Sequence, residues 1–210
     1  MYGEVFYVEW ILNSYVPVTL PSGCVLIAAE GVSRQGKKPK SPADVVSVLE
    51  QLIVHEGFDP ERFELKKHET GKPYGILDGE EVGISISHCS SLLVCALHTN
   101  GETGIDVEPC GRPLHPSLRN RMVHPGEQGI LPEELCGIRI WTVKEAVLKY
   151  LGTGLRVAMN KIKLEMTNDY LFQAQINGDT LTVASFLFRD HWVAVAFHHQ
   201  EKPQNQHDTT

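Results

Sequence analysis

The order of hydrophobic and polar positions predicts a mixed α+β chain. Residues 2–12 ("YGEVFYVEWIL") are rich in β-forming types and alternate imperfectly, which predicts a strand. A helix is expected to follow, because Ser41 can cap it, Pro42 suits its first position and Gly57 stops it. Between these signals apolar side chains recur at helical spacing, at Val45, Val48, Leu49, Leu52 and Ile53.

Residues 83–101 ("GISISHCSSLLVCALHTNG") have the pattern of a β-hairpin. Two apolar runs flank a turn near residues 89–91, and Asn100-Gly101 marks a second turn. Residues 104–108 ("GIDVE") are expected to form the next strand.

The second half of the chain repeats this order of elements. A predicted helix over 138–152 precedes extended segments at 161–166 and 170–179, and a hairpin over 181–200 follows them. "LLVCALHT" and "WVAVAFHH" are both apolar strands that end on histidine. An internal duplication explains the echo and predicts similar α+β halves at 1–102 and 103–200, with a ligand cleft between them. The polar tail at 201–210 lacks apolar anchors and is expected to be disordered. The alternative is two unrelated hairpins with similar patterns.

Composition and charge narrow the class of protein. The chain has 210 residues and a formal net charge of −7, which argues against a general nucleic-acid or anionic-membrane binder. Five cysteines form no CxxC pair, no signal peptide opens the chain, and no segment is apolar enough to span a bilayer. These features indicate a cytoplasmic protein with reduced thiols.

Two acids lie two positions apart in the predicted strand 104–108. Asp106 and Glu108 therefore share one face, while Ile105 and Val107 share the other. Neighbouring carboxylates repel each other, so the pair needs a lysine, an arginine or a divalent metal such as magnesium beside it. The alternative is an exposed strand face with two solvated acids.

A third acid and a lysine lie four positions apart in the predicted helix 138–152. Glu145 and Lys149 would form an ordinary surface ion pair on an exposed helix face. Trp141 lies on the same face and favours the wall of a cleft instead, where Glu145 could complete a metal site or act as a base and Lys149 could neutralise a phosphate. His88 follows Ser85 and Ser87 at a turn, so it is either structural or an anion donor.

Five blocks in this order resemble the 4'-phosphopantetheinyl transferases of the surfactin-synthetase-activating type. They are "GKPYG" (71–75), "ISISHC" (84–89), "GIDVEP" (104–109), "RMVHPGEQ" (121–128) and "WTVKEAVLKYLGTGL" (141–155). The resemblance covers residues 71–155 well and implies a pseudo-twofold pair of α+β halves with coenzyme A bound between them. It also implies an enzyme that uses magnesium, or manganese in its place, to transfer the phosphopantetheine arm of coenzyme A to a serine of an acyl or peptidyl carrier protein, releasing adenosine 3',5'-bisphosphate. The internal duplication favours a protein that works as a monomer.

The resemblance assigns roles to particular residues. It makes Asp106, Glu108 and Glu145 the metal ligands, with Glu145 as base for the incoming serine, directly or through water. Lys149 would hold a pyrophosphate oxygen, as part of the catalytic set with Asp106 and Glu145. His88 would contact a coenzyme A phosphate beside Ser87, and Lys72 would lie against the nucleotide end.

The chain departs from the family at its first helix. Members usually bind the 3'-phosphate with basic residues just before and within that helix, whereas "ADVVSVLEQLIV" has none. Arg34, Lys37, Lys38, Lys40 and Ser41 precede it and could substitute.

Residues 112–126 combine arginines with apolar side chains, so they are either a carrier docking surface or a packed linker and helix.

Two other functions stay open for the whole protein. One is a non-catalytic carrier-protein or nucleotide-binding module with this fold, and the other is a magnesium-dependent phosphoesterase.

Overall fold

The computed structural model describes residues 7–10, 18–30, 42–127 and 135–198. Their strands form two antiparallel sheets, one of six strands in the order β1-β2-β6-β5-β4-β3 and one of five in the order β7-β11-β10-β9-β8. The first sheet comprises β1 (Tyr7–Trp10), β2 (Cys24–Glu30), β3 (Phe63–Lys67), β4 (Pro73–Leu77), β5 (Glu80–His88) and β6 (Leu92–His98). The second comprises β7 (Gly104–Pro109), β8 (Lys163–Asn168), β9 (Leu171–Ile176), β10 (Asp179–Phe188) and β11 (His191–Phe197).

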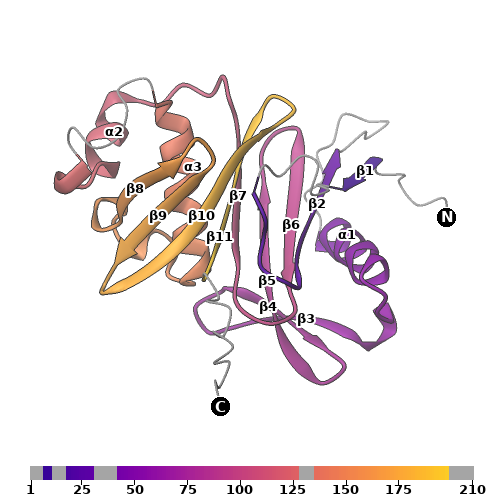
Figure 1. Ribbon diagram of the computed structural model, residues 1–210. Helices are drawn as coiled ribbons and strands as arrows, with labels where there is room; N and C mark the ends of the chain where they lie inside the picture. Colours follow the sequence, from indigo (N-terminus) through magenta and orange to yellow (C-terminus); the bar gives the residue numbers. More distant parts are fainter. Residues whose placement is uncertain (1–6, 11–17, 31–41, 128–134, 199–210) are drawn as a thin grey trace, which may run out of the picture.

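The two sheets lie face to face between two long helices (Figure 1). Helix α1 (Pro42–His55) covers the outer face of the first sheet, and α3 (Gly137–Tyr150) covers the outer face of the second. Side chains from both sheets, including Val94 on β6 and Val195 on β11, form the core between them. The result is four layers: helix, sheet, sheet, helix.

The two halves have the same topology. From β2 onward, each half runs strand, long helix and four strands, and β2-β6-β5-β4-β3 has the same spatial order as β7-β11-β10-β9-β8. Equivalent hairpins even use equivalent turns: Asp78-Gly79 joins β4 to β5, Asn177-Gly178 joins β9 to β10, and all four residues have positive φ. Such pairs favour the tight turn that matches the twist of a hairpin. The fold class is therefore the expected α+β pair of similar halves.

Most expected elements are present, with bounds that differ by a few residues from those expected. The hairpin at 83–101 corresponds to β5 and β6, "GIDVE" lies in β7, and the first helix begins at Pro42. Of the strand expected over 2–12, the structure describes β1. The boundary at 102 and 103 falls between β6 and β7 and stays a prediction. The expected tail at 201–210 lies outside the described residues.

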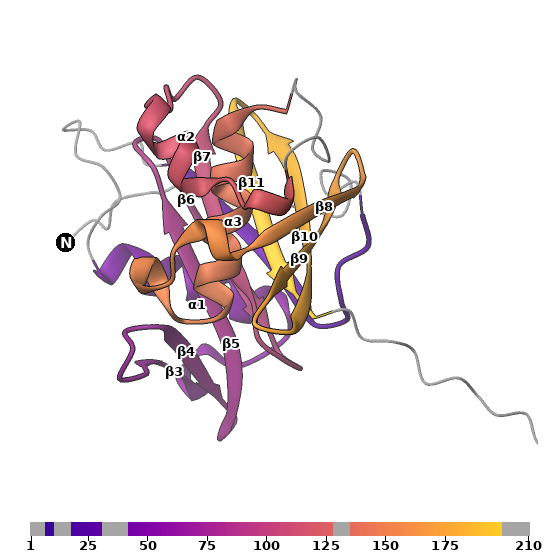
Figure 2. The same cartoon turned by 90° about the vertical axis from the view of Figure 1, so that its left-hand side faces the viewer.

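Four short helices belong to the second half, namely α2 (Pro116–Met122), Pro125–Glu127, Gly154–Arg156 and Met159–Lys161. Figure 2 shows α2 on the side of α3. Across the described ranges, none of the helices has the length and apolar character needed to cross a membrane.

Candidate functional site

The two acids of β7 lie on the face that α3 covers. Ile105 and Val107 point the other way, into the core between the sheets, so the alternation expected from the sequence holds. Asp106 is only 5% exposed. The alternative of a freely solvated acidic strand face is therefore wrong for Asp106.

Gly104 allows α3 to approach β7 closely. A Cβ atom at this position would lie 2.1 Å from the carbonyl oxygen of Ala146 and 2.4 Å from the backbone nitrogen of Tyr150. Only a glycine tolerates this contact, since both neighbours are backbone atoms of α3. The close packing brings Glu145 and Lys149 from the helix to the acids on the strand.

Asp106 is the centre of a hydrogen-bonded group. Its Oδ1 accepts from Lys149 Nζ at 2.7 Å and from Ser87 Oγ at 2.7 Å. Its Oδ2 is buried and has no hydrogen-bond partner. Buried oxygens without a partner are rare and often indicate an ion or water that completes the site.

Glu108 and Glu145 are electrostatically coupled to Asp106. Burial raises the pKa of Glu145 to about 7; the negative charge of Asp106 adds to this rise, while Lys149 opposes it. Burial also raises the pKa of Glu108, whereas Arg112, which forms an ion pair with it, lowers that pKa. The three carboxylates thus share one electrostatic environment, and Lys149 and Arg112 compensate part of its charge.

The sequence allowed two hypotheses for Lys149: a surface ion pair with Glu145, or a place in the wall of a cleft. In the structure, Lys149 of α3 forms its ion pair with Asp106 of β7. Trp141, one turn before Glu145, lies under Arg112, with 5.6 Å between the guanidinium carbon and the ring centre.

A cleft of about 230 Å³ opens between the two halves next to this group. The first half contributes the segment 70–73 and the strand residues Ser85 and Ile86, and the second contributes Leu148, Lys149 and two glycines of the following loop. Lys72 and Lys149 therefore face one cavity from opposite halves. This arrangement suits an anionic ligand.

The side chain of Lys72 already has partners within the protein, so it is less free to move than a lysine whose only task is to bind a phosphate. Its side chain is 9% exposed, and its Nζ donates to Glu102 Oε2 and to the carbonyl oxygen of Tyr150, each at 2.5 Å. Gly152 permits this position, because it has a positive φ and a Cβ there would lie 3.0 Å from Lys72 Cδ. Lys72 therefore links the two halves at the floor of the cleft.

The hydroxyl groups of β5 hold the edge of β7. Ser85 Oγ accepts from the backbone nitrogen of Ile105 at 2.8 Å, and Ser87 Oγ donates to Asp106. Since neighbouring residues of a strand point to opposite faces, His88 points away from Ser87, and it is exposed at the end of β5. Ser87 therefore contacts Asp106, whereas His88 lies at the exposed end of β5.

The residues expected to bind the nucleotide just before the first helix lie outside the described residues. They are Arg34, Lys38, Lys40 and Ser41.

One buried ion pair was not expected from the sequence. Lys144 and Glu127 are fully buried and 2.7 Å apart, and Lys144 Nζ also donates to the carbonyl oxygens of Met122 and Ile162 at 2.8 Å. Burial lowers the pKa of Lys144, while Glu127 opposes this. The pair fixes the segment after α2 against α3, directly beside Glu145. The only sequence signal was a glutamate inside "RMVHPGEQ", and nothing in its spacing identified Lys144 as its partner.

Comparison with known proteins agrees with this geometry. Residues 102–197 match the family model described as the 4'-phosphopantetheinyl transferase superfamily, which covers the whole second sheet and α3. A segment of 106 residues is 26% identical to 4'-phosphopantetheinyl transferase gsp of Aneurinibacillus migulanus and covers 48% of this chain and 43% of that relative. The strand and helix that carry Asp106, Glu108, Glu145 and Lys149 lie within the matched range, so over residues 102–197 the chain resembles the 4'-phosphopantetheinyl transferase superfamily.

Proposed function

We propose that this protein transfers the 4'-phosphopantetheine arm of coenzyme A to a serine of an acyl or peptidyl carrier protein and releases adenosine 3',5'-bisphosphate. The observation that carries the proposal is buried Asp106, which pairs with Lys149 beside a cleft between the halves and shares its electrostatic environment with Glu108 and Glu145. The family match and the name of the similar protein support the same reaction class.

The residues present fit a magnesium or manganese ion. Asp106 Oδ2 is buried without a hydrogen-bond partner, and Glu108 and Glu145 add carboxylates to the same environment. Magnesium prefers such oxygen ligands and usually combines one or two carboxylates with water and substrate phosphates. Asp106, Glu108 and Glu145 would hold the ion. When bound, it would neutralise the negative charge that grows on the pyrophosphate of coenzyme A.

Lys149 and Glu145 supply the remaining chemistry. Lys149 already pairs with Asp106 and lines the cleft, so its ammonium group can also reach a pyrophosphate oxygen. Burial raises the pKa of Glu145 to about 7 in the metal-free site, and a bound divalent ion would lower that pKa again. Glu145 would then be a carboxylate that can accept a proton from the serine hydroxyl. The serine oxygen then attacks the phosphorus that bears the pantetheine arm, and adenosine 3',5'-bisphosphate leaves.

The cleft is the proposed site of coenzyme A. Lys72 would lie against its nucleotide end, and His88 would contact a phosphate from the exposed end of β5. Ser87 already donates to Asp106, so we propose that it orients this acid as well as lying beside the phosphate. The basic segment with Arg34, Lys38, Lys40 and Ser41 remains the proposed partner of the 3'-phosphate.

A groove beside α2 is the proposed carrier-docking surface. It is lined by apolar side chains and one arginine, namely Leu118, Arg121, Met122, Trp141, Val157, Ala158 and Met159. This mixture suits a partner with an apolar patch on an acidic surface. Leu118→Glu should raise the KM for the carrier and leave that for coenzyme A unchanged. Leu187→Glu, at an exposed position of β10 outside the groove, is the matched control.

The decisive experiment is the intact mass of a purified apo carrier protein after incubation with this protein, coenzyme A and magnesium. A mass gain of one phosphopantetheine arm that EDTA prevents supports both the reaction and the metal. Release of adenosine 3',5'-bisphosphate without a carrier would favour a phosphoesterase. Coenzyme A binding without either reaction, across several carrier types, would favour a non-catalytic module.

A further inference from the structure

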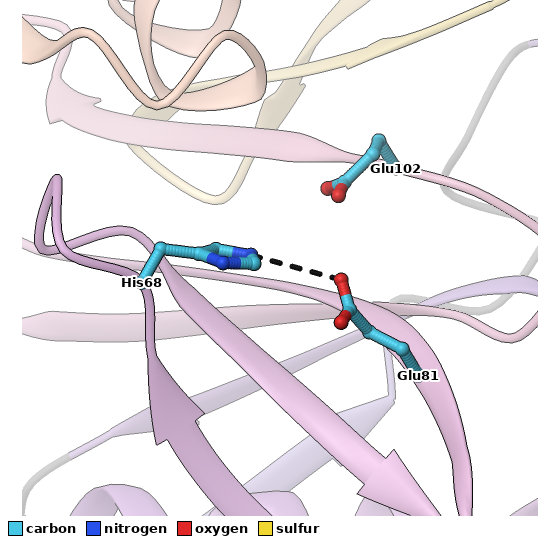
Figure 3. A group of neighbouring side chains, drawn as sticks. All are labelled: His68, Glu81 and Glu102. Atoms are coloured by element: carbon cyan, nitrogen blue, oxygen red, sulfur yellow. Dashed lines mark ion pairs between the residues drawn. The ribbon is translucent and has the colours of Figure 1, made fainter.

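A second group of metal-ligating side chains lies outside the site around Asp106. His68 follows β3, Glu81 belongs to β5, and Glu102 precedes β7, so three separate segments meet (Figure 3). One ligand atom of each side chain lies within 4.8 Å of the others. Within the described part of the chain, no other three histidines, cysteines or acids gather so closely.

The spacing of these atoms is close to that of a zinc site. Two ligands about 2.1 Å from a tetrahedral zinc ion lie roughly 3.4 Å apart. His68 Nε2 and Glu81 Oε1 are 3.7 Å apart, and the carboxylate of Glu102 points toward both in Figure 3. Small rotations of the two glutamate side chains would therefore complete three bonds and leave a fourth position for water.

The histidine of this group is well positioned. Its ring stacks on Tyr74, with ring centres 4.2 Å apart. Its backbone accepts from Gly71 and donates to Lys72 at 2.9 Å each, in the tight turn that precedes β4. A ring held in this way loses little freedom on binding an ion.

The identity of the ligand set selects the class of ion. An imidazole nitrogen with two carboxylates favours zinc and related transition metals, whereas magnesium and calcium favour oxygen ligands alone. The side chains of His68 and Glu81 are 38% and 52% exposed, so an ion from solvent can reach them. We propose that His68, Glu81 and Glu102 form a binding site for a divalent transition-metal ion of the zinc class.

Glu102 couples this site to the cleft. The same carboxylate holds Lys72 Nζ at 2.5 Å. A metal ion on Glu102 would compete for this carboxylate and loosen Lys72, which then retains the carbonyl oxygen of Tyr150 as acceptor. The ion pair between Lys72 and Glu102 therefore connects the proposed metal site to the floor of the cleft. The proposed metal site does not depend on the proposed transferase activity.

Calorimetric titration of the EDTA-treated full chain with zinc chloride tests the proposal. The Asp106→Asn variant is the starting protein, because it removes a ligand of the proposed magnesium site. We expect it to bind zinc, and we expect His68→Ala or Glu81→Gln added to it to weaken binding by at least about tenfold, the loss that even an outer partner of a metal ligand can cause. His55→Ala is the matched control, since His55 lies 3.1 Å from one glutamate, Glu56, but is not part of the three-residue group.

A second readout identifies the ligand directly. Binding should shift the ring-nitrogen NMR resonances of His68 and leave those of His55 unchanged. No zinc binding to the Asp106→Asn protein, or equal binding with and without His68, would overturn the proposal. Neither measurement uses a carrier or coenzyme A, so a failed transferase assay has no effect on the outcome.

Discussion

Lys149 of α3 and Asp106 of β7 form a 2.7 Å ion pair that joins the helix and the strand of the second half. The same Asp106 oxygen accepts from Ser87 of the first half, while the second oxygen is buried without a partner. The carboxylate of Asp106, on β7, thus connects α3 to the first half of the chain, and its second oxygen still has lone pairs for an ion.

Asp106→Asn should reduce the proposed transfer by at least about 100-fold, because it removes a charged ligand from the proposed metal site. The amide is nearly isosteric, so the fold should persist. Transfer measured by carrier mass, with circular dichroism of the same sample, checks both statements. A wild-type rate in this variant would refute the metal role of Asp106.

Lys149→Ala should slow transfer by about 100-fold through the loss of charge stabilisation on the pyrophosphate. The effect should appear mainly in kcat, because the interaction is expected to strengthen in the transition state. Lys161→Ala, at an exposed position outside the cleft, serves as control. An unchanged rate would make Lys149 a purely structural partner of Asp106.

Glu145→Gln should stabilise the metal-free protein at pH 8 more than at pH 5. The folded-state pKa of Glu145 is raised to about 7, so the native state binds this proton more tightly than the unfolded state. The free energy of unfolding of the wild-type protein should therefore fall as pH rises from the ordinary pKa of glutamate toward 7. The fall should be roughly 1–2 kcal/mol once solvent screening is taken into account. Urea unfolding at both pH values measures the difference, and an equal effect at pH 5 and pH 8 would contradict it. Glu165→Gln, at an exposed acid on β8, is the matched control.

Gly104→Ala should destabilise the protein by roughly 3 kcal/mol, because the new methyl group would meet the backbone of α3 at 2.1 Å. The shift of α3 should also reduce activity, since it moves Glu145 and Lys149 away from β7. Gly111→Ala is the matched control, because nothing lies within 4 Å of a Cβ there. Equal thermal midpoints for the two variants would show that α3 does not need this close contact.

Glu127→Ala should cost about 3–5 kcal/mol of unfolding free energy, since it leaves the buried charge of Lys144 without its counter-charge. Chemical unfolding of the purified variant gives this value. Glu64→Ala breaks an exposed pair with Lys66 and should leave the unfolding midpoint unchanged. A small effect of Glu127→Ala would mean that the carbonyl oxygens around Lys144 suffice to hold its ammonium group.

Local pattern predicted much of the fold. The alternation in "GIDVE" correctly separated Ile105 and Val107 in the core from Asp106 and Glu108 on the other face. The helical spacing of Val48, Leu49, Leu52 and Ile53 likewise identified the buried face of α1. Such features follow from the periods of strands and helices, which are written in consecutive residues.

Contacts between distant segments could not be predicted in the same way. The echo of "LLVCALHT" and "WVAVAFHH" aligns Leu92 with Trp192, yet the core between the sheets holds Leu92 of β6 and Val193 of β11. A shift of one residue moves every side chain of a strand to the other face. The partner of Lys149, the constraint on Lys72 and the pair Lys144–Glu127 depend on such packing, and no local pattern encodes them.

The hydroxyl groups of Ser85 and Ser87 have a consequence for how the two halves respond to ionic strength. Beside the cleft, the ion pairs Lys149–Asp106 and Arg112–Glu108 each lie within the second half, whereas Ser85 and Ser87 join the halves through short hydrogen bonds. Salt weakens attraction between exposed charges far more than buried hydrogen bonds and apolar packing. The joint between the halves should therefore keep its geometry in salt concentrations that weaken the docking of a charged partner.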